Sequence, residues 1–207
     1  MADNFDSYVP EMVATRRKFH ARPELGWTEF ETTATVITRL RALGYQVLCG
    51  TQVVKPEAVL GRDEKLVAAA IERAKSAGVS DDLLSEMGGY TGAVGILDTG
   101  RPGPTLAFRF DMDALPIQEI TDPASDHLPA REGFASTFKG KMHACGHDSH
   151  TGIGLHGPQD GGASLAHHLR RHHLPVLPES PRAHEPERGE RHAHRHERGR
   201  HGGGWCR

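Results

Sequence analysis

The chain has 207 residues and a formal net charge of −2, a length that allows one domain with an appendage. No run of about 18 apolar residues is present, so we expect neither a membrane span nor a membrane partner. Three scattered cysteines are too few for a disulfide scaffold, and the acidic N-terminus lacks a signal-peptide pattern, so we expect a cytoplasmic protein.

Alternating helices and strands are predicted along the first 110 residues. Apolar spacing predicts a helix from Val9 to Phe19, ended by Pro23. A second helix follows a capping box formed by Thr28 and Glu31 and ends at Gly44. Further helices are predicted over 64–77 and 81–87, and strands over 45–49, 92–97 and 104–110, with a turn at 98–103. This alternation predicts an α/β fold.

The segment 143–150 is the richest in chemistry, with three histidines, one cysteine and one aspartate in eight positions. Thiolate and imidazole are ligands that a borderline-soft divalent ion prefers. Cys145 and His147 lie two positions apart, so both can point at one ion. Asp148 is placed to accept the second ring N–H of a ligating histidine. The pattern favours a metal site over a polar loop with a structural cysteine, with His143 and His150 shaping the site.

Two aspartates follow the predicted strand at 104–110. Asp111 and Asp113 alternate with Met112 and share one face of an extended chain. The carboxyl end of a strand in an α/β sheet is where such folds place their sites. A helix cap or a turn would explain these residues by themselves, but the neighbouring cysteine and histidines favour a role at the metal site.

Three further polar residues receive structural interpretations. We expect His20 to be structural, His127 to lie in a loop, and Arg109 to sit in a strand and pair with a buried carboxylate.

Three stretches together resemble the M20 metallopeptidase/amidohydrolase family, namely 16–25, 111–116 and 143–151. Within it they are similar to the branch of aminoacylase-type and indole-acetyl-amino-acid hydrolases, and the stretches 50–89 and 97–104 point to the p-aminobenzoyl-glutamate hydrolases. The resemblance covers residues 1 to about 155. It implies a zinc-peptidase-like α/β/α sandwich, of which residues 1–156 hold the N-terminal part, with 50–89 as a helical surface insertion.

The resemblance also implies an activity, which is cleavage of an amide bond next to an amino-acid carboxylate. The implied substrates are small molecules, either p-aminobenzoyl-glutamate or an N-acyl amino acid, and not nucleic acid. The family uses two divalent ions, zinc, manganese or cobalt, which polarise the scissile carbonyl and lower the pKa of bound water. Carried over by motif, Cys145 and His147 are metal ligands, and Asp113 is the catalytic carboxylate that orients the metal site. A homo- or hetero-oligomer is implied for the intact protein.

The chain departs from the family pattern after the histidine motif. The family takes its general base and a further ligand from a Glu-Glu pair, and this chain contains no Glu-Glu pair. Later histidine ligands and a second domain used for dimerisation are also missing. We therefore expect a truncated chain that holds about half of the catalytic domain and is inactive by itself.

Residues 157–207 have a different composition, with nine His, nine Arg, eight Gly and five Pro. Such a segment buries too little apolar surface to offset its ordering entropy, so we expect a disordered tail. Three interpretations of this tail are open. It could be a histidine-rich metal-binding tail or a basic tail that touches nucleic acid or acidic surfaces. The third interpretation, which we favour, is the product of a frame shift near Leu155. The alternative function is a non-catalytic metal-binding protein with a histidine-rich tail. The nucleotide sequence after the Leu155 codon separates these interpretations.

Overall fold

The computed structural model describes residues 8–98, 100 and 102–156. All of them belong to the first of two compact units, Met1–His173. The predictions for the tail at 157–207 lie outside the described residues. Within the described part, no helix has the length and apolar character needed to cross a membrane.

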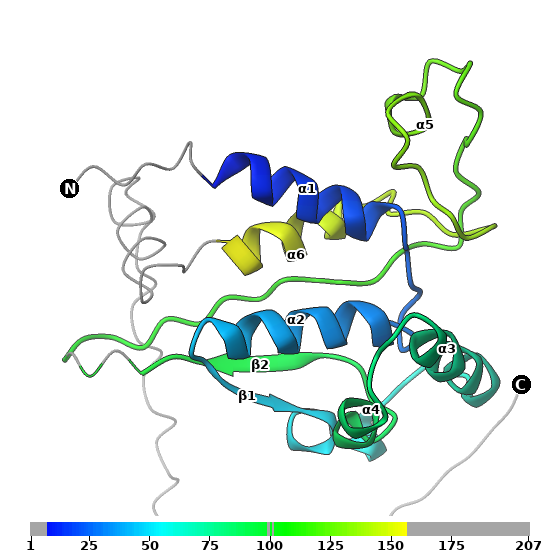
Figure 1. Cartoon of the computed structure of the whole chain (residues 1–207). Helices are drawn as coiled ribbons and strands as arrows, with labels where there is room; N and C mark the ends of the chain where they lie inside the picture. The colour runs from blue at the N-terminus through cyan, green and yellow to red at the C-terminus, as the bar shows by residue number, and fades with distance from the viewer. Residues whose placement is uncertain (1–7, 99, 101, 157–207) are drawn as a thin grey trace, which may run out of the picture. The chain divides into compact units, whose positions relative to one another are not determined.

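The described chain combines helices with two short strands (Figure 1). In chain order the elements are α1 (Val9–His20), α2 (Phe30–Ala42), β1 (Gln46–Cys49), the 3-10 turns Gly50–Gln52 and Pro56–Ala58, α3 (Glu64–Ser76), α4 (Asp81–Met87), β2 (Ala93–Ile96), α5 (Leu128–Arg131) and α6 (His147–His156). The predicted α/β class is therefore confirmed, and each of the first four helices lies within one or two residues of its predicted range.

The start of α2 differs from the prediction. Glu29 occupies the N-cap position and makes no side-chain cap hydrogen bond. The Thr28 hydroxyl instead donates to the carbonyl of Leu25 at 2.7 Å. The predicted capping box is therefore wrong, because the preceding turn uses the Thr28 hydroxyl. The predicted end at Gly44 is correct, since this residue has a φ of 83°, a left-handed value that glycine adopts without strain.

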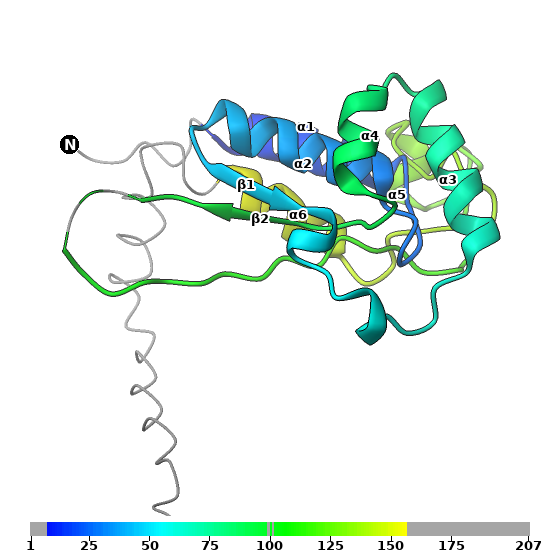
Figure 2. The ribbon, with the colours of Figure 1, turned by 90° about the horizontal axis from the view of Figure 1, so that it is seen from below.

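The strands β1 and β2 form an antiparallel pair, with Gln46 opposite Ile96 and Cys49 opposite Ala93. After β2 the chain turns and runs back in the opposite direction (Figure 2). The predicted strand at 104–110 is wrong, because residues 102–113 have no strand hydrogen bonding. Leu106 and Phe108 are about half exposed there. A strand forms only when a neighbour pairs with its backbone groups, and no described residue pairs with this segment.

The larger apolar core lies between α2, α3 and α4. Its buried members come from α2, from the end of β1 and from the inner faces of α3 and α4: Phe30, Ile37, Cys49, Val67, Ala70, Ala74, Leu84 and Met87. The segment 50–89 therefore contributes buried residues to the core, and its interpretation as an insertion stays a prediction. Apolar residues at helical spacing on α3 and α4 require a partner, and α2 supplies it.

A buried ion pair holds the loop before α2 against α3. Glu24 has no exposed surface and pairs with Arg73 of α3. The backbone N–H of Thr32 donates to the second Glu24 oxygen at 2.8 Å. This loop matters for the site, because the carbonyl of Glu24 accepts a 2.7 Å hydrogen bond from Ala114, just after the two aspartates.

The helices α1 and α6 pack together around a second, smaller core of Phe19, Val36 and Leu155 (Figure 1). At the far end of α6, the hydroxyl of Thr15 lies 2.9 Å from Nε2 of His156. These contacts fix α6, which carries the histidine motif, on the first helix of the chain.

Candidate metal and catalytic site

The N-terminus of α6 presents two histidines side by side. Gly146 precedes the helix with a φ of 90°, a conformation that a residue with a Cβ rarely adopts. His147 and His150 lie three positions apart and therefore share one face of the helix. Their rings are stacked, with centroids 5.2 Å apart and planes inclined by 28°. Two imidazoles thus point in the same direction from the start of one helix.

Asp113 orients the first of these rings. Nδ1 of His147 lies 2.9 Å from the Asp113 carboxylate and 3.0 Å from the Asp113 carbonyl oxygen. Both groups are acceptors when the carboxylate is ionised, so Nδ1 carries the proton. The lone pair of the His147 ring therefore lies on Nε2, which is the arrangement of a metal-ligating histidine held by a carboxylate.

Asp111 completes a donor set with these histidines. One ligand atom from each of Asp111, His147 and His150 lies within 4.8 Å of the others. Arg109 forms a hydrogen-bonded ion pair with Asp111, which lowers the pKa of that carboxyl below its usual value. One carboxylate and two imidazoles are ligands that suit zinc, and the set fits a divalent ion.

Of the two predicted metal ligands, the structure places only one in the donor set. His147 lies in this donor set, whereas Cys145 is a free, exposed cysteine outside it. Asp113 contacts His147. The assignment of Cys145, His147 and Asp113 as site residues stays a prediction. From the sequence, Asp111 was expected to have a role at the metal site and His150 to shape it. The signal that singles out His150 is its three-residue spacing from His147 on a helix.

Two sequence interpretations at this site are wrong. Asp148 does not face His147, because as the next residue on a helix it points about 100° away, into the interior. It is fully buried and lies 2.8 Å from the ring of His20. Arg109 does not pair with a buried carboxylate, since its side chain is 87% exposed and pairs with Asp111.

His143 lies behind the site as a neutral, buried imidazole. Burial lowers its pKa to about 4, and neither ring nitrogen has a hydrogen-bond partner among the described residues. Its ring centroid is 6.4 Å from that of His20. The predicted role of His143 in shaping the site stays a prediction.

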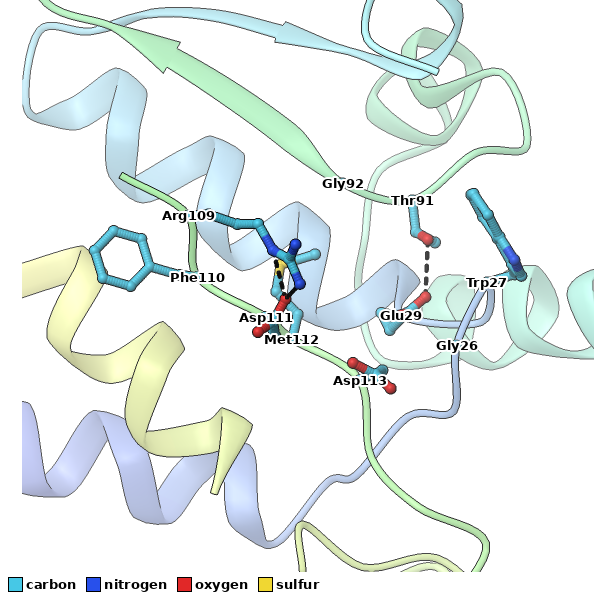
Figure 3. A pocket seen from close by; sticks show the side chains of 10 residues that line it. All are labelled: Gly26, Trp27, Glu29, Thr91, Gly92, Arg109, Phe110, Asp111, Met112 and Asp113. Carbon is cyan, nitrogen blue, oxygen red and sulfur yellow. Dashed lines mark hydrogen bonds and ion pairs between the residues drawn. The ribbon is translucent and has the colours of Figure 1, made fainter. Parts of the chain in front are cut away.

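A hollow of about 280 Å³ opens beside Asp113 (Figure 3). Trp27, Glu29 and Thr91 line one side, and the chain from Arg109 to Asp113 lines the other. The Thr91 hydroxyl donates to Glu29 at 2.8 Å. Burial raises the pKa of Glu29 to about 7, and the nearby charges of Glu24 and Asp113 act in the same direction. The hollow adjoins the metal donor set, because Asp111 is among its lining residues.

Comparisons with known proteins agree with this chemistry. Residues 107–158 match the model of the family described as peptidase family M20/M25/M40. Indole-3-acetyl-aspartic acid hydrolase from Enterobacter agglomerans is 48% identical over 166 residues, which are 79% of this chain and 36% of that protein. A p-aminobenzoyl-glutamate hydrolase component from Escherichia coli is 44% identical over 168 residues, 80% of this chain and 36% of that protein.

A solved structure matches as well. An aminobenzoyl-glutamate utilization protein from Klebsiella pneumoniae superposes with a TM-score of 0.55 at 38% identity, covering 81% of this chain and 33% of that one. The chain thus spans about a third of the length of the relatives that it matches. These matches confirm the predicted M20 relationship and the interpretation of the described residues as part of an α/β peptidase-like domain.

Proposed function

Because the chain carries M20 sequence, we propose that it holds part of the site of a metal-dependent amidohydrolase. The proposed reaction is cleavage of an amide bond next to an amino-acid carboxylate, in p-aminobenzoyl-glutamate or an N-acyl amino acid. The relatives named for hydrolysis of indole-3-acetyl-aspartate and p-aminobenzoyl-glutamate support this substrate class. The observation that carries the proposal is the donor set of Asp111, His147 and His150.

A divalent ion would be held by this donor set, with Cys145 as a further ligand implied by the family motif. Bound there, the ion would supply Lewis-acid polarisation of the scissile carbonyl. Asp113 holds the proton on Nδ1 of His147 and so keeps Nε2 available as a ligand. Trp27 and Glu29 border the adjoining hollow, where an acyl group of the substrate would lie.

We propose that the 207-residue chain by itself does not hydrolyse these substrates above background. The family takes its general base from a Glu-Glu pair, which this chain lacks. General base catalysis typically contributes about 10²–10⁴-fold to the rate. A chain extended with the corresponding part of a relative is expected to recover turnover that a chelator removes, and Cys145→Ala should abolish that turnover.

Metal binding by single variants tests the proposal directly. Cobalt(II) serves as the probe, because its visible spectrum reports coordination. Residues 157–207 contain nine histidines, which are potential cobalt ligands, so each spectrum is read as a difference from that of His147→Ala. We expect this difference to vanish in Asp111→Asn and His150→Ala, and to lose its thiolate absorption in Cys145→Ser.

The outcomes separate the candidate functions. A His147-dependent spectrum supports the amidohydrolase site. Cobalt binding that is unchanged in all four variants would contradict it and would favour a non-catalytic metal-binding protein that uses the histidines of residues 157–207.

A further inference from the structure

His20, on the last turn of α1, lies between two buried carboxylates. Its Nδ1 is 2.8 Å from Asp148 and its Nε2 is 2.9 Å from Glu119. The side chains of Asp148 and Glu119 are both 0% exposed, and that of His20 is 3% exposed. Both ring nitrogens of one imidazole therefore contact carboxylates inside the protein.

These two contacts determine the charge of the cluster. Each contact between a ring nitrogen and a carboxylate oxygen needs one proton, and an imidazolium supplies both. Although burial alone would lower the pKa of His20, the hydrogen bonds to Asp148 and Glu119 outweigh it and raise the pKa. Arg16 adds a second positive charge, 2.7 Å from Asp148. Two cations thus lie against the two buried carboxylates, with the side chain of Arg16 34% exposed.

The two carboxylates belong to the two segments that build the candidate site. Asp148 follows His147 directly on α6. Glu119 lies on the segment that contains Asp111 and Asp113, six positions after Asp113. Glu119 is itself fixed, because His127 contacts one oxygen at 2.7 Å and the Ser136 N–H donates to the other at 2.6 Å.

A single side chain on α1 therefore joins the histidine segment to the aspartate segment. Neighbouring residues on a helix move together, so a rotation of the α6 N-terminus that released Asp148 would also turn His147 away from Asp113. The contact between Thr15 and His156 holds only the opposite end of α6, nine positions further on.

We propose that His20 is a positioning residue that holds α6 and the Asp111–Glu119 segment in register, so that His147 faces Asp113 and stacks on His150. This role deepens the proposed function and rests on it, but it makes a prediction about the metal-free protein as well. Removing the His20 bridge should disturb the His147 ring, even though the two residues do not touch in any recorded hydrogen bond.

The test uses ring N–H signals of the full chain, labelled with ¹⁵N-histidine and kept free of metal. The His147 Nδ1–H signal is assigned by its loss in His147→Ala. We expect this signal to be lost or strongly shifted in His20→Gln. Glutamine has a single NH2 group and lacks the ring whose two nitrogens donate to carboxylates on opposite sides. Asp148→Asn, which keeps the side-chain volume, is measured in parallel in case His20→Gln does not fold.

Two control variants separate positioning from a general loss of stability. Arg17 lies on the same helix as His20, and Arg17→Gln breaks its exposed ion pair with Glu132. Thr15→Val loosens the far end of α6 without touching the His20 cluster. Both variants are expected to keep the His147 ring signal, even if circular dichroism shows that their thermal stability is lower.

Cobalt titration provides the second measurement. Loss of a residue that orients a ligand typically weakens metal binding by about 10- to 100-fold, and we expect this range for His20→Gln at the His147-dependent site. An unchanged His147 ring signal in folded His20→Gln and Asp148→Asn would overturn the positioning role. If the wild-type chain shows no His147-dependent cobalt binding, the proposed function fails, while the ring signals still decide the role of His20.

Discussion

Replacing Glu29 by glutamine is expected to change how the stability of the protein depends on pH. Glu29 is only 7% exposed, and its carboxylate accepts a hydrogen bond from the hydroxyl of Thr91. Burial raises the pKa of this carboxyl from 4.5 to about 7. Glutamine keeps the acceptor for Thr91 but has no proton to lose, so the variant isolates the cost of the buried charge.

The sign and size of the effect follow from the pKa difference. Between pH 4.5 and about 7 the folded state holds the Glu29 proton while the unfolded state releases it. The free energy of unfolding therefore falls as the pH rises through this window. One pKa unit corresponds to about 1.4 kcal/mol, so the shift amounts to about 3 kcal/mol, to order of magnitude.

The assay is urea unfolding followed by circular dichroism, at several values between about pH 4 and about pH 8. We expect Glu29→Gln and wild type to differ least at the acidic end, and the variant to gain about 3 kcal/mol relative to wild type by the alkaline end. Other groups that titrate in this range contribute to both proteins and cancel in the difference. Glu57→Gln, at an exposed position, is the control. Parallel stability curves for Glu29→Gln and wild type would refute the reasoning.

Two further predictions concern the core. Gly50→Ala should lower the free energy of unfolding by about 1–3 kcal/mol, because a Cβ there would lie 2.7 Å from the carbonyl oxygen of Met87. Gly61 has a similar positive φ but open space around it, so Gly61→Ala should lower this free energy less in the same urea assay. Ile37→Ala should lose about 2–5 kcal/mol through the cavity left in the larger core, against less than about 0.5 kcal/mol for Val13→Ala, which is 40% exposed; equal losses would contradict the assigned core.

Local sequence determined the helices and the most distinctive chemistry of this protein. The apolar spacing of α1 to α4 predicts their ranges because a helix satisfies its own backbone groups and needs only one apolar face. The left-handed turn at Gly44 follows from the residue type alone. The cysteine and histidine motif at 143–150 is equally local, and the M20 relationship that it suggested is confirmed by the comparisons.

Tertiary structure decided which side chains meet. The strand expected at 104–110 could not form from its own sequence, because its hydrogen bonds must come from a neighbour. Asp148 looked like a partner of a ligating histidine, yet the helical turn directs it to His20, 128 positions earlier in the chain. Nothing in the sequence around Glu119 indicated a role at the site. Only the structure shows that its carboxylate lies 2.9 Å from the ring of His20. Such contacts depend on how α1 and α6 pack, since the position of a buried charge is set by the partners that surround it in space.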